Sequence, residues 1–269
     1  MSGMEDRRVA SLHRYPVKSM LGEDLDRLEI DRHGVVGDRG LALLDVVGGR
    51  VATAKQPRWW RNLLQCRAVS TDDGIRIVLP DGRRIPADEA DDAMSALLAR
   101  PVRMATTRAE GATVERPDPE DVLARGLDAD IDPALLEIAQ GTPGGRFVDH
   151  SPVHLITTAT LDRLGVEARR YRPNLVIETP ADEDPFGENA WLGREFSIGE
   201  VRLRGTLPTP RCSVPTLEHG DLPRAPEALR PLVELNRVEV EGFGVLPCAG
   251  MYAEVVRTGT IRVGDRLAD

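Results

Sequence analysis

The distribution of glycine and proline limits what this chain can fold into. Its 269 residues include 25 glycines and 20 prolines, scattered from end to end. Proline terminates helices and glycine weakens them, so long amphipathic helices are excluded over most of the sequence. What remains is a series of short segments with alternating apolar and polar residues, bounded by turn residues, which is typical of strands. We therefore expect a mainly β fold with a few helices (β/α+β), with the short strands packed in a barrel-like way.

The expected elements fall into two groups separated by a polar stretch. The first group comprises a strand over Val9–Tyr15, hairpins over 40–54 (turn Gly48-Gly49) and 74–87 (turn Asp81-Gly82), a helix over 91–100 and a strand over Val102–Ala105. The second comprises strands over Val153–Ile156 and 173–179, paired strands over 196–205, helices over Ala159–Leu164 and 225–235, and two strands over 251–267. Thr157 and Thr158 offer an N-cap to the helix that starts at Ala159.

The stretch between the two groups is polar and rich in turn formers, so it predicts an irregular connector and a domain boundary. We expect a β-barrel-like domain over residues 1–110, a connector over 111–145 and a second domain over 146–269.

Charge and cysteine content exclude several classes of protein. A net charge of −9 argues against a broad surface for nucleic acid or for an anionic membrane. No apolar run approaches the roughly 18 residues of a membrane span, and the first ten residues lack the apolar core of a signal peptide. Three cysteines without a CxxC pair favour a reducing compartment, so we expect a cytoplasmic protein without a disulfide framework.

Three stretches carry residues suited to binding an anion. Lys18 and Ser19 offer an ammonium group and a hydroxyl after the first strand, and Arg39 is preceded by Asp38, which can orient its guanidinium. Arg172 is expected to be extended because Pro173 follows it, and Asn174 can both donate to and accept from a heterocycle. Taken one at a time, each stretch is more commonly a solvated strand end or a surface turn.

Cys212 is the most distinctive candidate, and it lies in the proline-rich stretch LPTPRCSVPT, residues 207–216. The prolines exclude a helix and argue against a central strand, so a rigid, irregular segment is expected. Arg211 is expected to favour the thiolate of Cys212, which can serve as a nucleophile or as a metal ligand. Cys66 and Cys248 lie in apolar surroundings and are expected to be structural.

Several stretches in register along nearly the whole chain resemble the MOSC family (molybdenum cofactor sulfurase C-terminal domain) in its form with an N-terminal β-barrel domain. They are YPVKSM, GVVGDRGLALLD, TAKQPRW, HLITTATLDRL, RRYRPNLVIE, PTPRCSVPT and GMYAEVVRTGTIRVGDRL. The resemblance is to the amidoxime-reducing type of molybdenum enzyme. It implies that residues 1–110 form the N-terminal domain of that family and residues 146–269 the MOSC domain.

The resemblance also implies roles for individual residues. A molybdenum cofactor (molybdopterin with molybdenum) is expected, with its phosphate held by Lys18, Ser19 and Arg39 and its pterin contacted by Arg172 and Asn174. Thr157 and Thr158 are expected at the rim of the same pocket, with Arg211 beside the metal ligand. Cys212 is expected to supply the thiolate ligand to molybdenum. The implied reaction removes oxygen from an N-hydroxylated or N-oxide small molecule, with electrons from a separate flavin or iron–sulfur reductase.

Two other functions remain open at this point. The chain can instead be a sulfur carrier or cofactor-delivery protein that holds a persulfide on Cys212. It can also be a cofactor-free enzyme that keeps the fold and uses the cysteine as a nucleophile.

Overall fold

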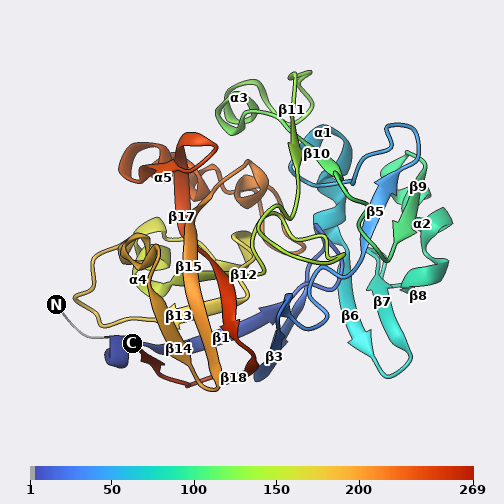
Figure 1. Ribbon diagram of the computed structural model, residues 1–269. Helices are drawn as coiled ribbons and strands as arrows, with labels where there is room; N and C mark the ends of the chain where they lie inside the picture. The colour runs from blue at the N-terminus through green and yellow to red at the C-terminus, as the bar shows by residue number, and fades with distance from the viewer. Residues whose placement is uncertain (1–3) are drawn as a thin grey trace.

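The computed structural model describes residues 4–269, and it confirms the mainly β class (Figure 1). Its strands are β1 Arg8–Arg14, β2 Glu23–Leu25, β3 Arg27–Asp31, β4 Gly34–Val35, β5 Ala42–Asp45, β6 Arg67–Thr71, β7 Gly74–Val78, β8 Arg84–Pro86, β9 Val102–Ala105, β10 Thr113–Arg116, β11 Ala134–Glu137, β12 Val153–Thr157, β13 Leu175–Glu178, β14 Glu195–Ile198, β15 Val201–Pro210, β16 Arg237–Val240, β17 Gly244–Arg257, β18 Gly259–Arg262 and β19 Leu267–Ala268. Its α-helices are α1 Pro57–Trp60, α2 Asp91–Leu98, α3 Pro119–Arg125, α4 Thr158–Leu164 and α5 Arg230–Leu235. None of the helices described is long and apolar enough to cross a membrane.

The largest sheet draws strands from both halves of the chain. Its hydrogen-bonded order is β19-β14-β15-β17-β12-β13-β1-β2, with β16 added to β17, and within the described residues this path is open at both ends. β12 and β13 are parallel, as expected for two strands joined by the crossover helix α4, while β1 lies antiparallel to β13. In Figure 1, β1 runs beside β13 in the lower part of the molecule, apart from β7, β8 and β9 at the right.

The first half therefore does not stand apart from the second. β3 pairs with β18 near the C-terminus, and the core beneath the large sheet combines Val9 and Leu12 with Leu155, Leu175 and other late residues. A separate core holds residues from 17 to 102, including Trp60, Ile77 and Met94, which pack together under β6–β9 and α2. The predicted boundaries at 110 and 146 stay predictions, but strands β1, β3 and β4 of the first half are structurally part of the second half.

Most of the predicted local elements are found. The hairpin over Asp81-Gly82 joins β7 to β8, and Thr157 accepts a hydrogen bond from the Thr160 N–H as the N-cap of α4. The turn at Gly48-Gly49 also forms, but its return arm makes only an isolated bridge between Leu44 and Val51. β5 pairs along its length with β9 instead, a partner distant in sequence.

Two expectations were wrong. The stretch expected to be irregular contains β10, α3 and β11, with β10 paired to β11. The prolines after Leu207 do not prevent a central strand, since β15 runs through Pro208 and Pro210 between β14 and β17. Shifts in register at Gly205/Leu207 and at Pro208/Pro210 locate bulges in this ladder, which is where a strand tolerates residues without an N–H.

Because β1 fills the core of the second half, Leu12→Ala should destabilise the whole molecule. Leu12 is 1% exposed, and truncation of such a buried leucine typically costs about 3 kcal/mol of unfolding free energy. Urea denaturation followed by circular dichroism measures this change. Leu192→Ala is the matched control, because Leu192 is 52% exposed and its truncation should cost below about 0.5 kcal/mol. Equal, small changes in both variants would show that β1 is not part of that core.

Candidate functional site

One cavity brings together seven of the nine candidate residues. Those that line it are Lys18, Ser19, Arg39, Arg172, Asn174, Arg211 and Cys212. They come from four distant places: the segment after β1, the loop between β4 and β5, the entry to β13 and the exit from β15. The three stretches predicted to bind an anion and the proline-rich stretch with Cys212 thus form a single site.

Thr157 and Thr158 lie elsewhere and are not among the described residues that line this cavity. The Thr157 hydroxyl caps α4 and donates to Glu188 Oε2 at 2.8 Å, while Thr158 Oγ1 lies 3.1 Å from Thr179 Oγ1. Thr157 is the last residue of β12 and the N-cap of α4, so its hydroxyl accepts a hydrogen bond from the backbone N–H of Thr160. The predicted role of both threonines at the pocket rim has no counterpart in this geometry.

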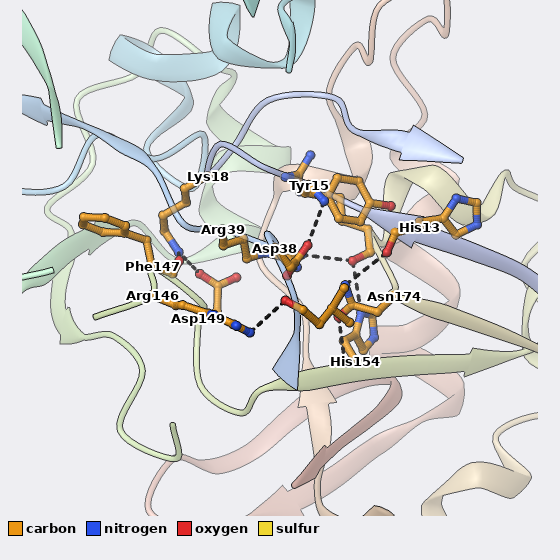
Figure 2. Close-up of polar contacts among 12 residues, drawn as sticks. His13, Tyr15, Lys18, Asp38, Arg39, Arg146, Phe147, Asp149, His154 and Asn174 are labelled. Atoms are coloured by element: carbon orange, nitrogen blue, oxygen red, sulfur yellow. Dashed lines mark hydrogen bonds and ion pairs between the residues drawn. The ribbon is translucent and has the colours of Figure 1, made fainter. Parts of the chain in front are cut away.

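The Lys18 ammonium group is buried against one carboxylate. Its Nζ donates to Asp149 Oδ1 at 2.6 Å and to the carbonyl oxygen of Phe147 at 2.8 Å (Figure 2). Lys55 Nζ lies 3.0 Å from the same Asp149 oxygen. Burial lowers the pKa of Lys18 to about 8, against the opposing effect of Asp149. Burial also acts to raise the pKa of Asp149, but Lys18 and Lys55 outweigh it and hold that pKa well below its usual range.

Arg39 is oriented by its neighbour, as the sequence predicted. Asp38 accepts a hydrogen bond from Arg39 Nη1 and another from the Tyr15 backbone N–H, the latter at 2.7 Å (Figure 2). Arg39 Nη2 donates to the carbonyl oxygen of Arg172 at 3.1 Å. The Tyr15 ring contacts both guanidinium groups, with its centroid 4.9 Å from Arg39 Cζ and 4.4 Å from Arg172 Cζ. Two arginines are thereby held against one aromatic ring.

Arg172 is buried with its hydrogen-bonding capacity only partly used. Its side chain donates from Nη1 to the carbonyl oxygen of Met20 at 2.6 Å, while Nη2 is buried and has no partner among residues 4–269. Burial lowers the pKa of Arg172 to about 10, and Arg39 adds to the effect. A buried donor without a partner costs free energy, and a bound acceptor removes that cost.

The expectation that Arg172 is extended was wrong. Its φ is 55°, in the left-handed region, because it ends the turn in which its N–H donates to the carbonyl oxygen of Arg169. The chain then reverses into β13. Ser19 and Arg39 are also left-handed, with φ of 65° and 47°. Side chains other than glycine adopt this conformation at some cost, and such residues cluster at functional sites.

Cys212 lies two residues after the end of β15 and is the partly exposed cysteine of the three. Cys66 and Cys248 are buried, and burial raises the pKa of each thiol to about 12, which keeps both neutral. Within the described residues, Cys212 is therefore the thiol accessible to a ligand in the cavity. No group of three or more His, Cys, Asp or Glu residues in the described part of the chain is arranged to hold a metal ion.

Arg211 anchors the segment that carries Cys212. Its Nε donates to the carbonyl oxygen of Ala249 at 2.9 Å, and its Nη1 donates to that of Tyr171 at 3.1 Å. Arg116 Nη2 in turn donates to the carbonyl oxygen of Arg211 at 3.1 Å. The hydrogen bonds of Arg211 thus go to the protein frame, and its predicted effect on the thiolate of Cys212 stays a prediction.

Sequence reasoning missed several residues of the site. Tyr15 lies within the stretch YPVKSM, but no local sequence pattern predicts that its ring packs between Arg39 and Arg172. Asp149, His154 and Arg116 also line the cavity or brace it, and Arg116 comes from the segment expected to be irregular. Asp149 could have been found from the sequence, because it is a carboxylate next to His150 just before the buried strand β12.

The charge of the cavity is opposite to that of the chain. Seven of its lining residues are lysine or arginine and two are carboxylates, whereas the whole chain carries a net charge of −9. The seven cations are Lys18, Arg39, Lys55, Arg116, Arg170, Arg172 and Arg211. Arg39 and Arg170 are paired with Asp38 and Glu167, and the remaining excess of cations favours the binding of an anion.

Comparison with known proteins assigns both halves of the chain to one family. Residues 6–116 match the MOSC N-terminal beta barrel domain and residues 144–268 match the MOSC domain. The chain belongs to the MOSC family. Similar proteins include mitochondrial amidoxime-reducing component 1 of Homo sapiens, which is 25% identical over 295 residues and covers 96% of this chain and 81% of that protein. The protein of the same name from Mus musculus is 24% identical, with coverage of 96% and 80%.

Among solved structures, the YUAD protein of Bacillus subtilis covers 97% of this MOSC protein and 93% of its own chain. The identity is 10% and the TM-score is 0.43.

The pKa of Lys18 predicts how an anion binds to the ligand-free protein. With that pKa at about 8, the fraction of charged Lys18 falls as pH rises, so affinity for inorganic phosphate should drop about eightfold between pH 7.5 and 9. Phosphate itself is mainly a dianion over this range. Calorimetric titration at constant ionic strength measures the affinity.

Lys18→Arg is the matched control, because arginine keeps its charge throughout this range and should flatten the pH dependence. The same eightfold fall in Lys18→Arg would mean that another group controls anion binding.

Proposed function

We propose that this MOSC protein is a molybdenum-cofactor oxidoreductase that removes oxygen from N-hydroxylated or N-oxide small molecules. The observation that carries the proposal is a cation-rich cavity with one accessible thiol, Cys212, at its wall. The relatives support it, because the two that span this chain are named for the reduction of amidoximes.

The residues present fit the phosphate and pterin of such a cofactor. Arg172 Nη2 is a buried donor without a partner, and the seven cations of the cavity lack enough carboxylates to neutralise them. A dianionic phosphate supplies negative charge for the cations, and the pterin heterocycle supplies an acceptor for Arg172 Nη2. The thiol chemistry also fits, since a cysteine thiolate is a preferred ligand of soft and transition metals.

Each group of residues then has a task. Lys18, Ser19 and Arg39 would hold the phosphate, and Arg172 would hold the pterin. Asn174 would contact the pterin as well, although its amide already accepts from the His154 N–H at 3.2 Å and donates to the His13 carbonyl at 3.3 Å (Figure 2). One amide hydrogen and one oxygen lone pair remain free for a heterocycle.

Cys212 would ligate the metal through its thiolate. When bound, the cofactor supplies two-electron removal of oxygen from an N–O bond, and the overall reaction consumes two electrons and two protons and releases water. The electrons would come from a separate donor protein.

The protein's own part is binding, orientation and exclusion of water. Hydrogen bonds within the protein hold the side chains of Ser19, Arg39 and Arg172 in place before any ligand arrives, so little ordering is left to be done on binding. Tyr171, Tyr252 and Phe243 add aromatic walls to the cavity, which lower the local dielectric and strengthen the interaction of cations with an anionic ligand.

The decisive experiment counts molybdenum in the protein made in a host that produces the cofactor. Wild type should carry about one molybdenum and one pterin per chain, and should reduce an N-hydroxylated test compound with a chemical electron donor. Cys212→Ala should lose at least about 100-fold of the activity, because the metal loses its protein ligand. Metal analysis by plasma mass spectrometry and product chromatography measure the two.

Cys66→Ala is the matched control, because it removes a buried thiol outside the cavity and should leave metal content and activity within about twofold of wild type. Wild-type protein without molybdenum would overturn the proposal, and a cyanide-labile sulfur on Cys212 in the absence of metal would favour a sulfur carrier.

A further inference from the structure

His154 occupies a central position that the proposed function does not yet use. It lies in β12, is 5% exposed and lines the cavity between Arg211 and Arg172. Its Nε2 is 2.5 Å from Arg211 Nη2, and its Nδ1 is 3.4 Å from the carbonyl oxygen of Arg172.

The partners of the ring determine its protonation. A guanidinium can only donate, so Nε2 must accept and cannot carry a proton. The single ring proton then lies on Nδ1, where it points to the Arg172 carbonyl. Burial, reinforced by Arg211, holds the pKa of His154 well below its usual range, in agreement with a neutral ring.

The surroundings leave the ring little freedom. A Cβ at Gly250 would lie 2.4 Å from the carbonyl oxygen of Leu155, 2.7 Å from His154 Nε2 and 3.3 Å from Arg211 Nη2, and Gly250 has a φ of 80°. Glycine is therefore required by the left-handed backbone and by the close approach of β12, and its missing side chain also leaves room for the imidazole beside the guanidinium. The Gly250 N–H is held by Glu188 Oε1 at 3.1 Å, and the preceding carbonyl oxygen, that of Ala249, is held by Arg211.

We infer that His154 is a positioning residue that couples the two walls of the cofactor pocket. Through Nε2 it fixes Arg211, and with it the start of the segment that carries Cys212. Through Nδ1–H it holds the carbonyl of the left-handed Arg172, the residue with the unpartnered Nη2. The inference rests on the proposed function, because its consequence is the seating of the cofactor between Arg172 and Cys212.

Two substitutions separate the hydrogen-bond role from simple filling of space. His154→Gln keeps an acceptor for Arg211 and a donor for the Arg172 carbonyl, whereas His154→Leu keeps much of the volume and neither polar group. Loss of a residue that orients a metal ligand typically weakens metal affinity about 10- to 100-fold. We expect His154→Leu to release molybdenum at least about tenfold faster during dialysis, and His154→Gln to stay within about threefold of wild type.

A second readout needs no cofactor. In ligand-free protein, the rate at which iodoacetamide alkylates Cys212 should change at least about threefold in His154→Leu and stay near wild type in His154→Gln. Only His154→Leu removes the acceptor for Arg211 Nη2 on the imidazole side, while the bonds of Arg211 to Ala249 and Tyr171 remain in both variants. Peptide mass spectrometry separates Cys212 from the buried Cys66 and Cys248. Thermal unfolding confirms that each variant is folded, and His154→Met replaces His154→Leu if the latter is not.

The outcomes distinguish the two proposals. Unchanged alkylation and unchanged molybdenum release in a folded His154→Leu, or equal losses in His154→Gln and His154→Leu, would overturn the role of His154. Wild-type protein that lacks molybdenum while the alkylation rates still differ as expected would overturn the proposed function and leave the positioning of Arg211 by His154 intact.

Discussion

The site depends on the burial of Arg39 and Arg172 against the single ring of Tyr15. Asp38 neutralises Arg39, but Arg172 makes no ion pair among residues 4–269 and has an orphaned nitrogen. Removing an arginine from water without a counter-ion costs several kcal/mol, so the rest of the fold must stabilise the arrangement. A bound anion offsets that cost, because it supplies the negative charge and the hydrogen-bond acceptor that Arg172 lacks in the protein alone.

The fold delivers the charged groups to one place through its crossed topology. β1 is built into the sheet of the second half, and the chain leaves it directly into Tyr15, Lys18 and Ser19. β13 pairs with β1, so the turn before β13 brings Arg172 to the same end of the sheet. The bulged β15 ends close by with Arg211 and Cys212. Neither half contains a complete site.

Local features of this architecture could be predicted from the sequence, and long-range ones could not. The Asp81-Gly82 hairpin, the N-cap at Thr157 and the pairing of Asp38 with Arg39 follow from neighbouring residues. The motifs in register also identified the family, which the domain matches confirm.

Other features were misjudged because their causes lie far along the chain. The strand conformation of Pro208 and Pro210 depends on bulges against β17. The left-handed Arg172 is an exception, because its cause is a local turn from Arg169 that outweighs the preference imposed by Pro173. The contact between His154 and Arg211 spans 57 residues, so no local pattern announces it. The predicted use of Thr157 at the pocket conflicts with its use as a helix cap, which the same sequence had also indicated.

A crystal structure of protein purified from a cofactor-producing host, with diffraction recorded just above the molybdenum absorption edge, tests most directly whether Cys212 ligates molybdenum in this cavity. We expect one anomalous peak at bonding distance from Cys212 Sγ, with phosphate density among Lys18, Ser19 and Arg39 and an acceptor at Arg172 Nη2. An anomalous peak away from Cys212, or a cofactor bound outside this cavity, would contradict that expectation.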